Sequence, residues 1–161
     1  MDLQQAKKVA LEYFQRAYEA QMMGDLDEAI RLYSRSIQTC PTAEAYTFLG
    51  WSFSFKGDYE KAIQFCRKAI EVDPDFGNPY NDIGAYLIEL GKLNDAVPWL
   101  KKAMTAERYE PRHYPHFNLG RIFEHQGKWV EAMEQYKKAL DLYPDYALAK
   151  ESYQQLQARL N

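Results

Sequence analysis

Hydrophobic and small residues recur along this chain with the spacing of an α-helix, in segments separated by short polar turns. The clearest pair of segments lies in residues 43–76, where each predicted helix has one apolar face. On that face the first helix carries Tyr46, Leu49, Gly50 and Phe53. The second helix carries Ala62, Ile63, Cys66, Ala69 and Ile70. Because apolar stripes of this period are buried against a neighbour, we expect the two helices to face each other as a hairpin.

The turn between these two helices occurs four times in the chain. Each copy is a glycine, then Asp or Lys, then Leu or an aromatic residue, with an alanine three positions later; the glycines are Gly24, Gly57, Gly91 and Gly127. They lie 33, 34 and 36 residues apart. A period of about 34 residues indicates stacked helical hairpins rather than one globular core. The glycine can adopt a positive φ at the end of a helix, and an Asp after it can cap the next helix.

Three further glycines fall in the middle of predicted helices, where each should cost about 1 kcal/mol relative to alanine. They are Gly50, Gly84 and Gly120, and their common phase predicts that they lie opposite Ala62, Ala96 and Ala132 respectively. A close approach of the paired helices is the expected compensation, because a larger side chain there would wedge the hairpin open.

These units resemble tetratricopeptide repeats over nearly the whole chain. The third unit matches that pattern with Tyr80, Ile83, Gly84, Leu87, Ala96, Leu100 and Ala103, and the fourth with His116, Leu119, Gly120, Phe123, Ala132, Tyr136, Ala139 and Pro144. The first unit is degenerate, with Arg16, Ala17 and Ala20 at positions where the family has Leu, Gly and an aromatic residue. Terminal units of repeat arrays are often atypical in this way.

The resemblance implies an all-α fold, an α-solenoid of four stacked antiparallel helix-turn-helix repeats with a right-handed superhelix. We expect a single domain over residues 1–161, with repeats at about 10–42, 43–76, 77–112 and 113–146. Residues 147–161 have helical spacing and are expected to form a C-terminal capping helix that covers the last repeat. Asp2 and Gln5 can form a capping box, which would make the first helix unusually long.

The junction between the third and fourth repeats departs from the pattern. Arg108 replaces the closing proline, and the 36-residue spacing places two extra residues between Glu107 and His113. Two structures are compatible with this insertion: a slightly longer loop, or a bend that reshapes the face used for binding. Pro115 is expected in the first turn of the following helix, where a missing amide donor is harmless.

In the family that this chain resembles, the first helix of each repeat lines the concave side of the solenoid. This geometry predicts a groove that is aromatic toward the N-terminus, with Phe14, Tyr18, Phe48, Trp51 and Phe55, and polar toward the C-terminus, with Asn78, Asn81, Asp82, Asn118 and Arg121. We expect the aromatic residues to receive apolar side chains of a bound peptide, and the amides to bind its main chain. Alternatively, the aromatic residues only pack against neighbouring repeats.

One subfamily binds acidic C-termini of chaperones through a clamp of Lys, Arg and Asn, and this chain lacks that clamp. Its matching positions hold Thr47, Trp51, Asp82 and Tyr114. Arg121 is the only well-placed cation of the predicted groove, so we do not expect a receptor for chaperone tails. A carboxylate or phosphate of another ligand can still pair with Arg121.

Composition narrows the choice of partner. With 20 basic and 23 acidic residues, the chain has no general attraction for nucleic acid or an anionic membrane. The resemblance to tetratricopeptide repeats implies another protein or a peptide as partner. The longest apolar runs are too short to span a bilayer, and no signal segment is evident; we therefore expect a cytoplasmic protein. Cys40 and Cys66 are expected to be packing residues.

Nothing in the sequence favours catalysis. It contains no glycine-rich phosphate loop, GxSxG elbow or HExxH motif, and His113 and His116 have no third metal ligand near them in sequence. We therefore expect neither a cofactor nor a metal. The resemblance implies a non-catalytic protein-protein interaction module or adaptor. Two alternatives remain open: a self-assembling scaffold, in which the 13 tyrosines would contribute to a homo-oligomer, or a sensor subunit of a larger complex.

Overall fold

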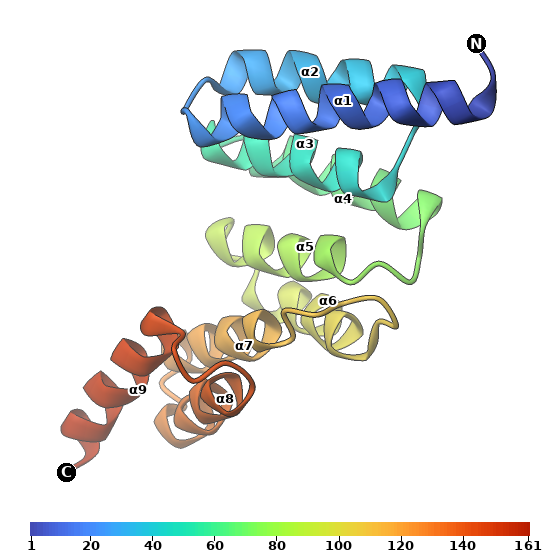
Figure 1. The fold of residues 1–161 in the computed structure, drawn as a ribbon. Helices are drawn as coiled ribbons and strands as arrows, with labels where there is room; N and C mark the ends of the chain where they lie inside the picture. Colours follow the sequence, from blue (N-terminus) through green and yellow to red (C-terminus); the bar gives the residue numbers. More distant parts are fainter.

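The computed structural model describes residues 1–161 as α-helices joined by short turns, without a β-strand (Figure 1). The helices are α1 (Leu3–Met22), α2 (Leu26–Thr39), α3 (Ala43–Phe55), α4 (Tyr59–Val72), α5 (Asn78–Glu89), α6 (Leu93–Thr105), α7 (His113–His125), α8 (Trp129–Leu142) and α9 (Ala147–Leu160). They form four antiparallel hairpins stacked in chain order, followed by α9 against α8. The expected all-α solenoid of four hairpins with a right-handed superhelix is confirmed.

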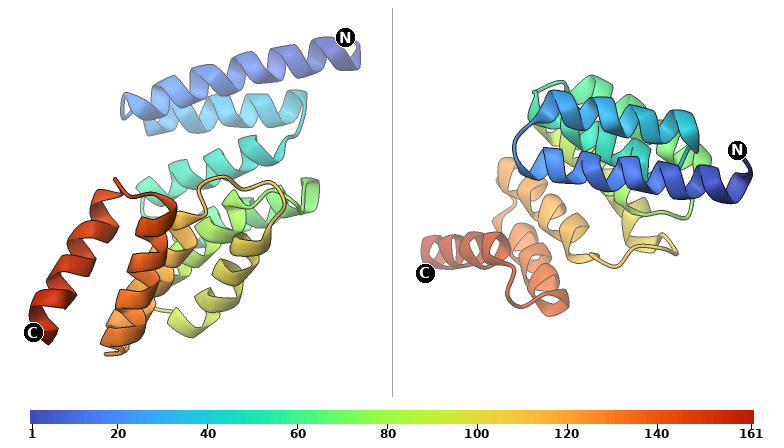
Figure 2. Two further views of the ribbon diagram at one scale, coloured as in Figure 1. Left: turned by 60° about the horizontal axis from the view of Figure 1, so that its bottom comes forward. Right: turned by 45° about the horizontal axis from the view of Figure 1, so that its top comes forward.

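The stack is open and curved, with α1 and α2 at one end and α9 at the other (Figure 2). The first helices of successive hairpins contact one another: α1 contacts α3, α3 contacts α5, and α5 contacts α7. The second helix of each hairpin instead packs on the first helix of the next one. Because the first helices are drawn together in this way, they form the inner, concave side of the solenoid.

The turns and helix ends have the backbone geometry and the capping hydrogen bonds that the sequence predicted. All four turn glycines have positive φ, for example 82° at Gly24 and 81° at Gly57. The Asp58 carboxylate accepts a hydrogen bond from the Lys61 amide at 3.1 Å and thereby caps α4. The expected capping box of Asp2 and Gln5 is present, and α1 is the longest helix, with 20 residues.

The glycines in the middle of α3, α5 and α7 lie where the two helices of a hairpin come closest. A Cβ added at Gly50 would lie 2.9 Å from the carbonyl oxygen of Ala62, so the expected contact is confirmed there. At Gly84 and Gly120 the nearest atoms belong to Leu100 and Tyr136, and at Gly84 the carbonyl oxygen of the expected Ala96 follows at 3.6 Å. Leu100 and Tyr136 lie one turn beyond the alanines that we expected, because a side chain of the second helix there is long enough to cover the glycine.

The buried apolar residues form a core that passes from one hairpin to the next. Its largest cluster runs from Ala62 and Cys66 in α4 through Ile83 in α5 and Leu100 in α6 to Ile122 in α7. At the C-terminal end, α9 buries Ala149 and Leu156, and Leu156 joins the cluster of the last hairpin. The final helix therefore covers this hairpin, as expected of a capping helix.

The irregular junction at residues 106–112 is fixed to the preceding hairpin by Arg108. The guanidinium of Arg108 donates hydrogen bonds to Asp73 at 2.6 Å and to Glu44 at 2.8 Å, and it lies 4.3 Å from the ring centroid of Phe76. Its backbone amide donates to the carbonyl of Asp75. Both carboxylates and the arginine are half-exposed, so the ring contact and backbone bonds add to ion pairs that are individually weak.

The same junction places Tyr109 directly against Gly77. The Gly77 amide donates a hydrogen bond to the carbonyl of Arg108 at 3.1 Å, and a Cβ on Gly77 would overlap the Tyr109 side chain. Arg112 holds the other end of the loop, because its guanidinium donates to the carbonyl of Met104 at 2.6 Å. The insertion is therefore an ordered bend that buries a tyrosine, which is the second of the two structures allowed by the sequence.

We predict that Gly50→Ala destabilises the protein by about 1–3 kcal/mol, although alanine is the better helix former by about 1 kcal/mol. The added methyl group meets a backbone carbonyl, which can move only if α3 and α4 separate. Thermal and urea unfolding followed by circular dichroism will measure the change. Gln64→Ala, at an exposed position of α4, is the control and should change stability by less than about 0.5 kcal/mol. An unchanged or raised stability of Gly50→Ala would contradict the proposed close contact.

Candidate functional site

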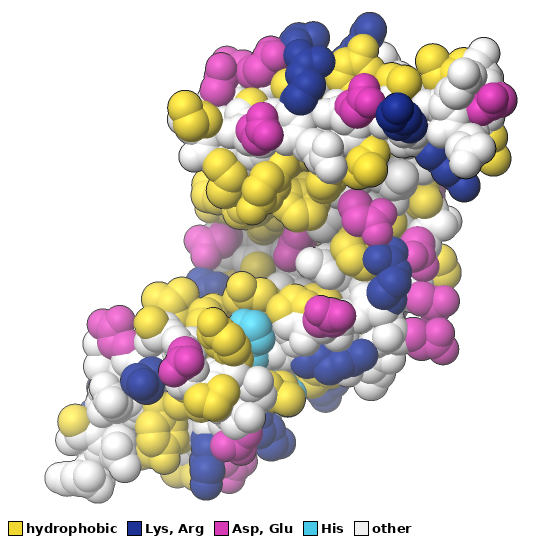
Figure 3. All heavy atoms as spheres, in the orientation of Figure 1, with side chains coloured by type: hydrophobic (Ala, Val, Ile, Leu, Met, Phe, Trp, Pro, Cys, Tyr) yellow, Lys and Arg dark blue, Asp and Glu magenta, His cyan; other side chains and the backbone are white.

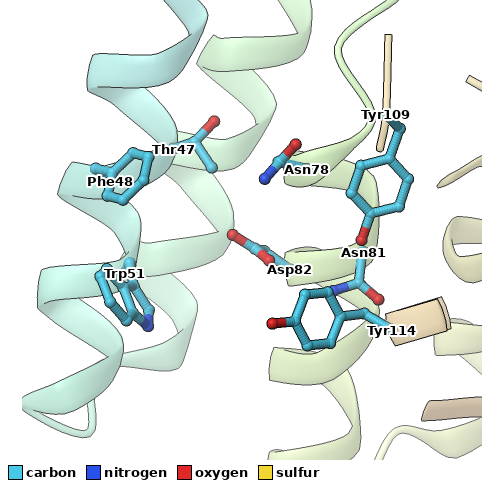
Figure 4. A pocket seen from close by; sticks show the side chains of 8 residues that line it. All are labelled: Thr47, Phe48, Trp51, Asn78, Asn81, Asp82, Tyr109 and Tyr114. Atoms are coloured by element: carbon cyan, nitrogen blue, oxygen red, sulfur yellow. The ribbon is translucent and has the colours of Figure 1, made fainter. Parts of the chain in front are cut away.

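A cavity of about 380 Å³ opens on the concave side between α3, α5 and α7. It is lined by Thr47, Phe48 and Trp51 from α3, Asn78, Asn81 and Asp82 from α5, Tyr109 from the junction loop and Tyr114 from α7 (Figure 4). The space-filling view shows a hollow between the upper and lower hairpins, with hydrophobic side chains above and below it (Figure 3). Five of the ten groove residues predicted from the sequence therefore meet around one cavity, from helices that are separated in the chain.

Helical register places the lining residues of α3 and α5 on one side. Phe48 and Trp51 are three residues apart on α3, and Asn78, Asn81 and Asp82 are spaced by three and four on α5. Such spacings bring side chains to the same face of a helix. Both helices keep their apolar faces, Leu49 on α3 and Ile83 on α5, in the core, so the polar and aromatic faces turn toward the cavity.

The predicted aromatic residues form a continuous row along the concave side. Ring centroids are 5.3 Å apart for Phe14 and Phe48, 6.0 Å for Tyr18 and Phe48, 5.6 Å for Phe48 and Trp51, and 5.0 Å for Trp51 and Phe55. Phe14 and Phe48 also pack on buried Tyr33, whereas Tyr18 is 42% exposed and Phe55 is 58% exposed. The row therefore combines packing between hairpins with a surface that is open to a ligand.

The predicted amide and arginine side chains form an internal chain of hydrogen bonds. Asn118 donates to Asn81 at 3.0 Å, and Arg121 donates to Asn118 at 3.2 Å and to Glu89 at 2.9 Å. Asn81 and Asn118 are buried. These amides tie α5 to α7 and are already engaged, so the expectation that they bind a ligand's main chain holds best for Asn78, which has no side-chain hydrogen bond within the protein.

Arg121 is also less available than we expected. Its guanidinium forms an ion pair with Glu89 and lies outside the lining of the cavity. Because its charge is compensated within the protein, it offers an anionic ligand little net attraction. Phe14, at the other end of the aromatic row, lines a different cavity of about 280 Å³ between α1 and the segment that joins α2 to α3.

Asp82 is the one charged residue of the main cavity. Its side chain takes part in none of the ion pairs of the structure and points into the space between α3 and α5 (Figure 4). Burial raises the pKa of this carboxyl to about 7, and the opposing influence of the Asn81 side chain is smaller. The ionised form is thus poorly solvated, and a cation brought next to it would stabilise it.

Sequence reasoning did not include Tyr109 and Tyr114 among the site residues. Tyr109 is only 4% exposed, and Tyr114 stands at the start of α7 with its ring packed on Tyr146. The two-residue insertion marked the region but not the direction of the bend, which depends on Gly77 leaving room for the Tyr109 ring. Thr47, the third lining residue outside the predicted set, donates its hydroxyl to the carbonyl of Ala43.

Three further features of the structure concern metal ligands, the two cysteines and the length of apolar helices. The structure contains no group of three or more His, Cys, Asp or Glu side chains close enough to hold a metal ion. Both cysteines are unpaired, and burial raises the pKa of the Cys66 thiol. No helix has both the length and the apolar character that a membrane span requires.

The fold and cavity define an α-solenoid of helical hairpins whose concave side is lined with exposed side chains. Two models of the tetratricopeptide repeat family match the chain, one over residues 43–76 and the other over residues 75–145. The chain belongs to the tetratricopeptide repeat family. The first hairpin lies outside both matches, in agreement with its degenerate sequence.

The relatives are distant. Sperm-associated antigen 1 of Rattus norvegicus is 28% identical over 142 residues, which are 88% of this chain but only 12% of that protein. Among solved structures, PilF of Pseudomonas aeruginosa has a TM-score of 0.87 at 21% identity, over 96% of this chain and 70% of its own. YrrB, described as a TPR protein with an unusual peptide-binding site, has a TM-score of 0.67 at 22% identity, over 93% of this chain and 77% of its own. At these identities the structural likeness shows the fold alone.

We predict that Asp82→Asn stabilises the protein above pH 7 by on the order of 1–2 kcal/mol. The pKa of Asp82 is about 7 in the folded protein against an ordinary value of 3.8, so the folded state binds more protons between these values. The contribution of Asp82 to the free energy of unfolding of the wild type is therefore greatest below about pH 4, and it falls as the pH rises to 7. Because Asn carries no charge, the advantage of Asp82→Asn should be absent at pH 4 and complete at pH 8.

Melting temperatures across this pH range will test that prediction, with Asp145→Asn, an exposed residue of the loop before α9, as the control. The control should show no such pH-dependent gain. A variant Asp82→Asn that is less stable than the wild type at pH 8 would mean that the carboxylate is stabilised by a partner within the fold.

Proposed function

We propose that this protein is a non-catalytic adaptor that binds an extended peptide segment of another protein on its concave side. The observation that carries the proposal is the continuity of the exposed aromatic row, from Tyr18 through Trp51 to Phe55, with the cavity between α3, α5 and α7. A segment laid along this row would place one side chain in the cavity and others against the rings.

The chemistry of this surface suits a protein ligand. Aromatic side chains give a large contact area with few rotatable bonds, and binding hot spots are enriched in Trp and Tyr. The cavity volume lies within the range of about 300–1,000 Å³ that is usual for specific binding sites. Among the residues that line the cavity, Asn78 provides an amide without a partner in the protein and Trp51 provides an indole ring. The near balance of acidic and basic residues does not favour nucleic acid.

The similar proteins support the proposal at the level of the class. Arrays of this family generally act as interaction modules, and one structural neighbour, YrrB, is described as having a peptide-binding site. Since the chain spans only 12% of the length of its relative sperm-associated antigen 1, that protein's role is not transferred to it.

Self-assembly is a second candidate function, and exposed apolar residues on α1 favour it. Leu3, Leu11 and Met22 on α1, and Met23 directly after it, are each more than half exposed. Apolar side chains gathered on a terminal helix are a common basis for contacts between copies. A homo-oligomer built through α1 would leave the cavity between α3, α5 and α7 free, so the two functions are separable by experiment.

We predict that immobilised wild-type protein enriches a family of peptides from a random dodecapeptide display library, and that Trp51→Ala weakens their binding at least 10-fold. Loss of the indole removes the centre of the aromatic row. Fluorescence anisotropy with labelled synthetic peptides measures the affinity. The control is Val130→Ala, which truncates a side chain that is 62% exposed at the start of α8 and lines no part of the cavity.

Circular dichroism must first show that both variants are folded. Peptides that bind the wild type, Trp51→Ala and Val130→Ala equally would show that the binding surface lies outside the concave side. If no peptide is enriched and light scattering shows a mass that rises with concentration, the self-assembling scaffold becomes the better description.

A further inference from the structure

Asp82 differs from the other carboxylates on the concave faces of the first helices. Glu44 is paired with Arg108 at 2.8 Å, and Glu89 is paired with Arg121 at 2.9 Å. Glu124 accepts a hydrogen bond from the Tyr136 hydroxyl at 2.6 Å. Asp82 takes part in no ion pair and receives no hydrogen bond from a hydroxyl; the Asn81 side chain is the one polar neighbour that lowers the pKa of this carboxyl.

The surroundings of Asp82 are aromatic and lack positive charge. Phe48 and Trp51 face it from α3, and Tyr114 faces it from α7 (Figure 4). No Lys, Arg or His is among the residues that line the cavity. A carboxylate bordered by aromatic rings is a favourable site for a cation, because the ring faces attract positive charge and the carboxylate provides a counter-ion.

We propose that this cavity is the specificity pocket for a basic side chain, arginine or lysine, of the bound peptide, with Asp82 as its counter-ion. The inference rests on the proposed function, since it names which residue of the peptide the concave side selects. The side chain would lie against Trp51 and Tyr114 with its charged end at Asp82, while the aromatic row from Phe48 to Tyr18 would contact apolar neighbours in the peptide.

Other occupants fit the cavity less well. An apolar side chain would remove water from the Asp82 carboxylate without replacing its hydrogen bonds, which is costly. A carboxylate or phosphate would be repelled by Asp82, no cation lines the cavity, and Arg121, outside the lining, is already paired with Glu89. The amides of Asn81 and Asn118 are bonded to each other, so they hold α5 against α7 and keep the position of Asp82 fixed.

The experiment uses the display library on the full chain at pH 8, with wild type and Asp82→Asn in parallel. We expect an arginine or lysine at one aligned position in most peptides enriched by the wild type, and no such preference with Asp82→Asn. The variant keeps the shape of the side chain and is expected to fold at least as well as the wild type, so loss of the preference would not reflect unfolding.

A double-mutant cycle with one enriched, histidine-free peptide then isolates the interaction. Replacing its basic residue by citrulline, which keeps much of the shape of arginine, or by norleucine should weaken binding to the wild type at least 10-fold. The same replacements should change binding to Asp82→Asn less than 3-fold. If Trp51→Ala abolishes binding but the basic residue proves dispensable, the concave side binds peptides and the assignment of the pocket is overturned. If no peptide is enriched, both proposals fall.

The pH dependence of binding gives an independent measurement. The titratable groups that face Asp82 are Cys66 on α4, Tyr86 on α5, Tyr109 on the junction loop and Tyr114 on α7. Burial raises the pKa of Cys66, Tyr86 and Tyr109, which keeps these three groups neutral below pH 8.

With a pKa of about 7, the ionised fraction of Asp82 falls from about nine-tenths at pH 8 to about one-quarter at pH 6.5. Affinity for the basic peptide should therefore fall about 4-fold over this range, and affinity of Asp82→Asn should stay constant. An affinity of the wild type that is unchanged by pH, or that rises as pH falls, would overturn the role of Asp82 as counter-ion.

Discussion

The contact between the middle of each first helix and its partner determines how far the two helices of a hairpin can separate, and the geometry of the stack depends on it. At Gly50 this contact joins backbone to backbone, since an added Cβ would lie 2.9 Å from the Ala62 carbonyl. With the second helix held this close, its far face packs on the next hairpin and the first helices meet along the inner side. The shape of the concave surface therefore depends on small residues, such as Gly50, that lie between the paired helices and not on that surface.

The junction before α7 shows how a small departure from the repeat changes that surface. The other hairpins are joined to the next helix by three to five residues that include a proline, whereas residues 106–112 bend back and insert Tyr109 over Gly77. Arg108 and Arg112 hold the two ends of the bend. The loop therefore adds a wall to the cavity, so the concave side of this array differs from that of a uniform one.

The period of the sequence was sufficient to predict the helices, their order and the faces that they bury, because each of these depends on contacts within one hairpin. The resemblance to tetratricopeptide repeats, and not the period alone, predicted Phe48, Trp51 and Asp82 as inward residues. Neither the period nor the resemblance predicted that Asn118 bonds to Asn81 and Arg121 to Glu89, since these partners come from the neighbouring hairpin. Contacts of that kind depend on the rise and rotation between hairpins, which a repeat pattern does not specify.

Asp82 connects the stability of the array with its proposed use. A carboxyl whose pKa is raised to about 7 by burial reduces stability at neutral pH, and an asparagine of the same shape would avoid that loss. The Asn81 side chain offsets only a part of this cost, and no cation lines the cavity. A cation of the ligand would favour the ionised form of Asp82 over the neutral form, because a poorly solvated carboxylate binds a neighbouring positive charge strongly. The energetic disadvantage of the free protein is therefore the expected counterpart of a pocket prepared for a positively charged side chain.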